Sequence, residues 1–205
     1  MKILFQGDSI TDCGRNRDND SYLGHGYPRF VQGKLMVAEP GVHTFVNRGV
    51  SGNRIVDVYA RIKADIINLA PDVMSILIGI NDVWHEVARQ NGVAAAKFEM
   101  IYDMLITEIK EELPDIKIMI LEPFVLKGCA TLEHWSEFHS ETLLRAQAAK
   151  RIAEKHNLTF IPLQEMFDSM PDCVSPDYWA GDGVHPTAAG HELISREWIK
   201  AFETL

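Results

Sequence analysis

The sequence places a serine where it could act as a nucleophile. Ser9 lies in the stretch Gly-Asp-Ser-Ile-Thr at residues 7–11, directly after the apolar run 2–6. Gly7 permits a tight turn, and Ser9 is predicted to lie at or near the start of a helix, where its own N–H has no helical partner. A serine that merely caps a helix would occur in the same setting. This stretch alone therefore leaves a structural and a chemical interpretation open.

A candidate base and its acidic partner lie together near the end of the chain. A serine hydroxyl is a poor nucleophile until a base takes its proton, and that base needs a third group to orient it. Asp182 and His185 are three residues apart in the stretch 182–186, so the carboxyl group can reach Nδ1 and leave Nε2 facing outward. Pro186 is expected in the first turn of the helix that follows, with Thr187 as capping chemistry. A solvated aspartate beside a loop histidine is the alternative.

Two further loops could supply donors to a developing oxyanion. Gly52, in the stretch 47–53, would let a backbone N–H approach a substrate closely, and the side chain of Asn81 could donate from the stretch 79–82. Losing one such donor costs about 2.7–4 kcal/mol of transition-state stabilisation. Either loop alone is typical of a turn, but together with Ser9 and His185 they indicate acyl transfer.

Two metal-like patterns are incomplete. His85 and Glu86 begin a zinc-protease motif, but position 89 is arginine instead of the second histidine. The acidic stretch 18–20 lacks the rest of a calcium loop. The sequence therefore predicts no metal site.

The elements that must position these residues follow an alternating pattern of strands and helices. Five strands are expected at 2–6, 43–47, 73–78, 117–121 and 158–161, and helices at 55–69, 98–113, 137–156 and 187–202. The runs are apolar almost throughout, which is typical of parallel strands covered on both faces. The alternation predicts an α/β chain, a three-layer α/β/α sandwich around a five-stranded parallel sheet, in one domain over residues 1–205. In such sheets, loops after the strands converge on a ligand crevice.

The composition limits the classes of molecule that the chain is expected to bind. The 205 residues carry a net charge of −9, which argues against binding nucleic-acid phosphates. No run approaches the ~20 apolar residues of a membrane span, and no signal-peptide pattern opens the sequence. The cysteines are odd in number and widely spaced, which suits a reducing, cytoplasmic setting; they are Cys13, Cys129 and Cys173. Whether the chain forms a homo-oligomer stays open.

Four short stretches of the sequence resemble the motifs of a known family. The stretches "GDSIT", "SGN", "GIND" and "DGVHP" resemble the four blocks of the SGNH (GDSL-type) hydrolases, in order, across residues 5–191. The resemblance implies a flavodoxin-like fold and ester hydrolysis through an acyl-serine, with no metal or cofactor. It implies Ser9 as nucleophile, Asp182 and His185 as its partners, and an oxyanion hole formed by the N–H groups of Ser9 and Gly52 and the side chain of Asn81.

A narrower resemblance suggests a substrate. Phrases such as "NRGVSGNRIVDVYARI" and "DGVHPTAAGH" resemble the intracellular xylan-acetylesterase branch, which implies an acetylated oligosaccharide as the small-molecule partner. Asp8, Trp84 and Trp179 are the candidate substrate contacts. Other aromatic residues of the predicted loops could also stack on sugar rings or simply anchor their loops: Tyr27, Trp135 and Tyr178.

Two alternative functions were weighed. A lysophospholipase or thioesterase of the same fold would favour longer acyl chains, whereas no long apolar loop or amphipathic lid suggests a lipid interface. A non-catalytic binding module would have no need for Ser9, Gly52, Asn81, Asp182 and His185 together. A short-acyl carbohydrate esterase is the function that the sequence favours.

Overall fold

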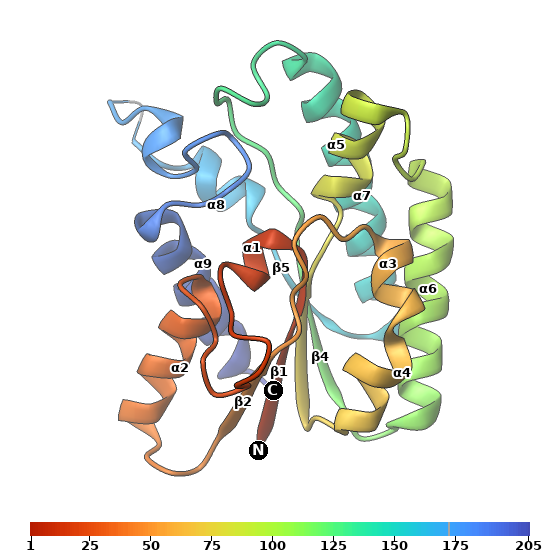
Figure 1. Ribbon diagram of the computed structural model, residues 1–205, viewed down its shortest axis with the longest axis vertical. Coiled ribbons are helices and arrows are strands. Elements are labelled where there is room, and N and C mark those ends of the chain that lie inside the picture. The colour runs from red at the N-terminus through yellow and green to blue at the C-terminus, as the bar shows by residue number, and fades with distance from the viewer. Residues whose placement is uncertain (172) are drawn as a thin grey trace.

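A five-stranded parallel sheet forms the centre of the molecule. The computed structural model describes residues 1–171 and 173–205. The strands are β1 (Lys2–Gly7), β2 (Thr44–Asn47), β3 (Val73–Leu77), β4 (Lys117–Leu121) and β5 (Thr159–Ile161), in the spatial order β2-β1-β3-β4-β5. Helices cover both faces, as Figure 1 shows. This architecture confirms the predicted three-layer fold, and its strand order is that of flavodoxin-like sheets.

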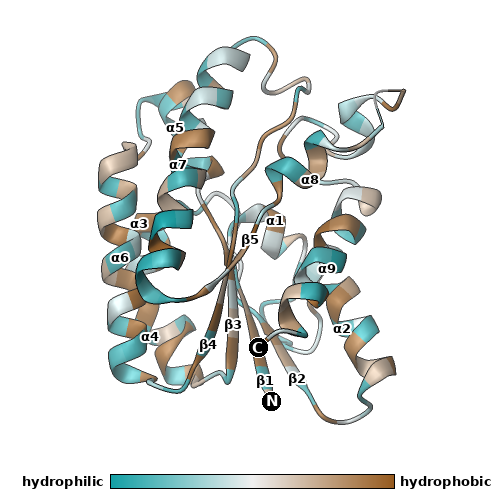
Figure 2. Cartoon of the chain, turned by 180° about the vertical axis from the view of Figure 1, so that it is seen from behind, coloured by the Kyte–Doolittle hydropathy of each residue, from teal (hydrophilic) through white to brown (hydrophobic). Residues whose placement is uncertain are grey.

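The alternation of side chains along each strand creates two cores. On β1, Ile3 and Phe5 pack with Tyr27 and Trp198 on one face, whereas Leu4 packs on the other. The first face is covered by α2 (Tyr27–Ala38) and α9 (Ala188–Phe202), and the second by α3 (Ile55–Ala60), α4 (Ile62–Asp65), α6 (Ala95–Glu112) and much of α7 (Trp135–His156). Figure 2 shows hydrophobic residues concentrated along the strands, while the helices carry both kinds of residue. Burial on both faces explains the nearly continuous apolar runs.

The helix predicted over residues 55–69 is divided into three pieces. Helix α3 ends before Arg61, α4 follows it, and a 3₁₀ turn occupies Ile67–Leu69. Arg61 has φ −113° and ψ 15°, outside the helical region. Its guanidinium donates to Gln6 Oε1 at 2.6 Å, and to the Arg48 carbonyl and Asn53 Oδ1, both at 2.8 Å. These tertiary contacts hold Arg61 out of the helix and explain the break.

Several other boundaries differ from the prediction. Helices α2 and α5 (Ile80–Arg89) were not predicted, nor was the short α8 (Gln164–Asp168). Thr187 caps α9 through a hydrogen bond from the Gly190 N–H, but the helix begins at Ala188. Pro186 therefore precedes the helix instead of occupying its first turn. A 3₁₀ turn at Pro176–Tyr178 completes the elements that bear on the site.

The parallel strands all direct their carboxyl ends toward one edge of the sheet. The loops that leave this edge carry the candidate residues, and the segments that follow β3, β4 and β5 lie in the upper half of Figure 1. In the part of the chain that the structure describes, no helix is both long and apolar enough to cross a membrane.

Candidate active site

Ser9 lies at the carboxyl end of the central strand β1, where the chain turns sharply into a short helix. Gly7 makes the turn possible, because an added Cβ would lie 2.3 Å from the Leu77 carbonyl oxygen on the neighbouring strand. Asp8 is the N-cap of α1 (Ser9–Asp12), and its side chain accepts from the Ile10 N–H at 3.0 Å. Ser9 is thus the first residue of the helix, and its N–H has no partner within the helix. The sequence prediction of a helix start at Ser9 agrees with this geometry.

A chain of hydrogen bonds links Ser9 to the last loop. Ser9 Oγ lies 2.9 Å from His185 Nε2, and His185 Nδ1 lies 2.7 Å from Asp182 Oδ2. The other carboxyl oxygen of Asp182 accepts from the backbone N–H groups of Val184 and His185, at 2.9 and 2.7 Å. These two backbone hydrogen bonds fix the Asp182 carboxyl group, so the His185 imidazole is held with Nε2 toward Ser9. The residues are 173 or more positions apart in sequence and meet as the sequence predicted.

The neighbouring Asp182 carboxyl group makes the His185 imidazole a stronger base than usual. The hydrogen bond to Asp182 raises the pKa of His185, against a smaller lowering by burial. For Asp182, burial acts to raise the pKa, but the hydrogen bonds from the His185 ring, the His185 N–H and the Val184 N–H outweigh it and hold the pKa well below its usual range. Asp182 therefore stays ionised at neutral pH and favours a protonated His185.

Two further candidate hydrogen-bond donors lie in segments next to the helix that carries Ser9. The Gly52 N–H has no acceptor among the described residues, and Gly52 has φ +81°. Asn81, the second residue of α5, donates one amide hydrogen to the Asn53 carbonyl at 3.1 Å, and the other has no acceptor in the part of the chain that the structure describes. The contact between Asn81 and Asn53 places that amide beside the Gly52 loop. With the Ser9 N–H, the predicted oxyanion donors therefore come from three adjoining segments.

Two carboxyl groups that support this arrangement were missed by the sequence reasoning. Asp12 is buried at 5% exposure and accepts from both the N–H and the hydroxyl of Ser51, next to Gly52. Asp82 is fully buried, and its carboxyl oxygens accept from the Ile55 N–H at 3.1 and 3.2 Å. The sequence gives one hint of their role: Asp12 follows Ser9 within α1, and Asp82 follows Asn81 within α5.

Asp8 requires a correction. It was predicted as a substrate contact, but it has no exposed surface, and one of its oxygens caps α1 while the other has no partner among the described residues. Burial raises its pKa to about 7, against lowering by the Ile10 N–H and by the charge of His185. Asp8 is therefore a buried neighbour of Ser9 and does not line the surface that a substrate could touch.

The aromatic candidates occupy different environments. Trp84, on α5, is half-buried, with its ring centroid 5.8 Å from that of His185. Trp179 is also half-buried and lies three residues before Asp182. Tyr27 is fully buried in the core, with its hydroxyl 3.1 Å from Thr11 Oγ1, so it is not available to a ligand, whereas Tyr178 is 59% exposed. Of these aromatic residues, Trp84 is the one whose ring lies beside His185.

The other patterns weighed in the sequence lie apart from this chemistry. Glu86, beside His85, uses its carboxyl group to accept from the Gly92 N–H at the end of α5. Within residues 1–171 and 173–205, no three His, Cys, Asp or Glu side chains are grouped to hold a metal ion. Cys13, Cys129 and Cys173 are free thiols.

Comparison with known proteins agrees with this site. The model of the GDSL-like lipase/acylhydrolase family matches residues 5–193, which include every residue of the candidate site. An acetylxylan esterase from Geobacillus stearothermophilus is 35% identical over 210 residues, covering 97% of this chain and 92% of that protein.

Solved structures give the same result. A chain described as a GDSL-like lipase from Parabacteroides merdae matches with a TM-score of 0.94 and 34% identity, covering 100% of this chain and 96% of its own. A catalytic mutant of the Geobacillus stearothermophilus acetylxylan esterase, with a serine replaced by alanine, matches with a TM-score of 0.87 and 33% identity, covering 98% and 93%. The similarity therefore extends over the whole fold and all the loops that carry the site.

Proposed function

The chain belongs to the GDSL-like lipase/acylhydrolase family and is a carboxylic ester hydrolase, and on that premise we propose that it removes acetyl groups from acetylated sugars. The proposal includes an acyl-serine intermediate on Ser9. The observation that carries it is the unbroken hydrogen-bonded chain from Ser9 Oγ through His185 to Asp182. Acetylated xylo-oligosaccharides are the substrate class that we propose.

In the proposed first step, Ser9 Oγ attacks the acetyl carbonyl carbon as His185 Nε2 takes the hydroxyl proton. The 2.9 Å separation of these two atoms is within the range needed for proton transfer. Asp182 orients the imidazole and stabilises the imidazolium that forms. His185 then gives the proton to the departing sugar oxygen. In the second step, a water molecule activated by His185 cleaves the acyl-serine, which releases acetate and restores the Ser9 hydroxyl.

The tetrahedral intermediates carry a negative oxygen that must be stabilised. We assign this task to the N–H groups of Ser9 and Gly52 and to the free amide hydrogen of Asn81. The absence of an acceptor for the Gly52 N–H in the described part of the chain supports this role. Each donor of this kind contributes about 2.7–4 kcal/mol to the stabilisation of the transition state.

The substrate assignment has two supports. The related protein that is 35% identical is an acetylxylan esterase, and its serine-to-alanine form is described as a catalytic mutant, which agrees with a serine nucleophile. In addition, the exposed His185 has the half-buried ring of Trp84 beside it. An aromatic surface next to the group that protonates the leaving alcohol suits a sugar as that alcohol.

The proposal is tested by measuring acetate release from acetylated xylotriose and from 4-nitrophenyl acetate, with the Ser9→Ala variant as the reference. We expect both substrates to be hydrolysed and Ser9→Ala to lose nearly all activity on both. Undiminished activity in Ser9→Ala would reject the acyl-serine. A series of 4-nitrophenyl esters from acetyl to octanoyl tests the acyl group, because rates that rise with chain length would favour a lysophospholipase or thioesterase.

The cellular setting is a separate proposal. The three free thiols suit a reducing compartment, and we propose that the protein acts in the cytoplasm. Fractionation of cells that express the chain tests this, because recovery outside the cytoplasmic fraction would contradict it.

A further inference from the structure

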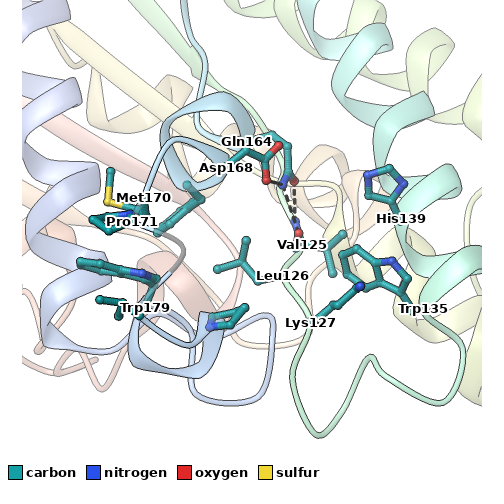
Figure 3. Close-up of a pocket in the computed structure, with 13 residues that line it drawn as sticks. Val125, Leu126, Lys127, Trp135, His139, Gln164, Asp168, Met170, Pro171 and Trp179 are labelled. Carbon is teal, nitrogen blue, oxygen red and sulfur yellow. Dashed lines mark hydrogen bonds between the residues drawn. The ribbon is translucent and has the colours of Figure 1, made fainter.

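A cavity of about 290 Å³ lies next to the loop that carries Asp182 and His185, although none of Ser9, Asp182 and His185 lines it. Its walls come from the segment after β4, the start of α7, helix α8 and the segment that leads to Trp179. Figure 3 shows Trp135, His139 and Lys127 on one side and Met170, Pro171 and Trp179 on the other, with Leu126 between them.

The inner wall of the cavity is attached to the catalytic loop. The Leu126 N–H donates to the Gly183 carbonyl at 2.8 Å, and the Ala130 N–H donates to the Asp182 carbonyl at 3.0 Å. Gly128 packs so closely that an added Cβ would lie 2.2 Å from the Asp182 carbonyl carbon. The cavity and the Asp182–His185 loop therefore share one rigid wall.

Aromatic contacts link His185 through Trp84 to α7, the helix whose start forms part of the cavity wall. The ring of Trp84 lies 5.8 Å from the His185 ring and 6.1 Å from the ring of Phe138, centroid to centroid. Phe138 immediately precedes His139, which lines the cavity. In the proposed reaction His185 protonates the leaving oxygen, so the alcohol part of the ester must lie on the His185 side of the site. The cavity is next to the loop that carries His185, whereas in the same proposed reaction the carbonyl oxygen of the ester is held by Gly52 and Asn81.

The cavity combines aromatic surface with polar groups. Trp135 and Trp179 are half-buried and provide large, rigid apolar faces. Gln164 holds the Asp168 carboxyl group by donating to one oxygen at 3.0 Å, and is itself fixed by two hydrogen bonds to the Val125 backbone. The second oxygen of Asp168 has no hydrogen-bond donor among the described residues.

The charges of the cavity favour a neutral ligand. Lys127 places its amino nitrogen 5.5 Å from the centre of the Trp135 ring, and Asp168 adds the opposite charge on the same cavity. The indole N–H of Trp179 is buried without a partner among the described residues. A ligand with both apolar faces and hydroxyl groups can use the aromatic surfaces together with Lys127 and Asp168, whereas an alkyl chain would leave these charged groups unpaired. The volume suits a small unit such as one sugar ring.

We propose that this cavity is a subsite for a pyranose ring of the substrate other than the ring that carries the ester at Ser9. The inference rests on the proposed sugar-esterase function and adds the place where the sugar chain is recognised. The indole groups of Trp135 and Trp179, which line the cavity, contact the ring, and Asp168 accepts from its hydroxyl groups. The enzyme therefore prefers an acetylated oligosaccharide over an acetylated single sugar.

The test compares kcat/KM on three substrates: 4-nitrophenyl acetate, acetylated methyl xyloside and acetylated xylotriose. Trp135→Leu and Asp168→Asn are expected to lower kcat/KM for acetylated xylotriose about tenfold, chiefly through KM. Their kcat/KM values for the two smaller substrates should be unchanged, because these do not reach the cavity. Matched controls are Leu132→Ala, an exposed residue near Trp135, and Glu165→Gln on α8; neither residue lines the cavity.

Activity on 4-nitrophenyl acetate reports folding, so a Trp135→Leu protein that loses all activity is set aside and Asp168→Asn decides. Equal kcat/KM values for acetylated xylotriose in Asp168→Asn and wild type would overturn the subsite while leaving the sugar-esterase proposal intact. A wild-type protein that cleaves 4-nitrophenyl acetate but neither acetylated sugar would overturn the proposed substrate class, and the subsite with it.

Discussion

The carboxyl group of Asp12 accepts hydrogen bonds from both the N–H and the hydroxyl of Ser51, each at 3.0 Å. Asp12 is the last residue of the helix that begins with Ser9, and Ser51 immediately precedes Gly52. The two segments are also in direct contact, since a Cβ on Gly49 would lie 2.3 Å from the Asp12 nitrogen. Asp12 therefore fixes the position of Gly52, a proposed oxyanion donor, relative to Ser9, the proposed nucleophile.

Replacing Asp12 should impair the chemical step more than substrate binding. We expect Asp12→Ala to lower kcat about tenfold or more with little change in KM, because a displaced Gly52 N–H weakens oxyanion stabilisation. Asp12→Asn should recover most of the activity, since its amide oxygen can still accept from Ser51. Steady-state kinetics on 4-nitrophenyl acetate measures both quantities.

The control for the Asp12 variants is a substitution of Arg17, which forms an ion pair with Asp12. Arg17 donates to the same carboxyl oxygen at 3.0 Å, but its side chain is 56% exposed. Arg17→Ala therefore removes the ion pair and leaves the Ser51 hydrogen bonds in place, and its kcat should match that of wild type. If Arg17→Ala and Asp12→Ala were equally impaired, the effect would come from the charge pair instead of the loop position.

Asp182→Asn should reduce kcat about 10⁴-fold, the loss seen when the acidic member of a serine protease triad is made neutral. The asparagine can occupy the same space but can present its amide N–H to Nδ1, which favours the wrong imidazole tautomer. Asp177→Asn is a suitable control, because Asp177 lies on the same segment and is exposed. Kinetics with 4-nitrophenyl acetate distinguishes the two, and a loss of tenfold or less in Asp182→Asn would argue against a role for Asp182 in orienting His185.

The pH dependence follows from the state of His185. The base must be neutral to accept the Ser9 proton, so kcat/KM should rise with pH and level off above the pKa of His185. The Asp182 hydrogen bond raises that pKa from its ordinary value of 6.5, so half-maximal activity should lie above pH 6.5. In Asp182→Asn the midpoint should move to lower pH. A wild-type midpoint at or below pH 6 would contradict this assignment.

Asp8 should make the protein less stable as pH rises. Its pKa is about 7 in the folded protein because of burial, against an ordinary value of 3.8. The folded state therefore binds more protons than the unfolded state between these values, so this group lowers stability as pH increases from about 4 to 7. Asp8→Asn, which preserves a capping oxygen, should be more stable than wild type at pH 8 by on the order of 4 kcal/mol.

Chemical denaturation of Asp8→Asn and wild type at pH 4, 6 and 8 tests that prediction. The difference in free energy of unfolding should grow with pH. A second buried carboxyl group, that of Asp82, also has a raised pKa, chiefly because of burial and in smaller part because of the charge of Asp8, so the difference between the two proteins reports Asp8 together with its coupling to Asp82. A constant difference across the pH range would show that Asp8 ionises in the folded protein at its ordinary pKa.

The strands and the site residues were accessible from the sequence because their signals are local. Each strand is a short apolar run, and β4 was predicted with its observed bounds. Ser9, Asp182 and His185 meet because the topology of a parallel sheet brings loops after different strands to one edge. The prediction needed only residue types, order and the fold class.

The remaining features depend on contacts between distant residues. Helix α2 was not predicted because exposed apolar residues obscure its inward stripe; Met36 is 55% exposed and Val37 is 82% exposed. The break at Arg61 depends on acceptors as distant as Gln6. The role of Asp12 arises only when α1 packs against the Gly52 loop. In each case the local sequence carries no signal for the partner that decides the outcome.

A substitution at Gly52 can distinguish an effect on kcat from an effect on the stability of the fold. It has φ +81°, and an added Cβ would meet no atom within 4 Å. Gly52→Ala should therefore fold, with a loss of about 1–2 kcal/mol from the left-handed backbone conformation. Its kcat should fall about tenfold or more, because relief of that strain turns the N–H away from the oxyanion and the new methyl group occupies the space above the donor.

Gly41 provides the matched control for Gly52. It has φ +77° and equally open surroundings, but it lies in the turn between α2 and β2, at the edge of the sheet away from the site. Gly41→Ala should lose a similar amount of stability and keep the wild-type kcat on 4-nitrophenyl acetate. Thermal unfolding and steady-state kinetics on both variants test the pair. Equal kcat values in the two variants would remove Gly52 from the oxyanion hole, because the shared backbone strain would then account for every effect of Gly52→Ala.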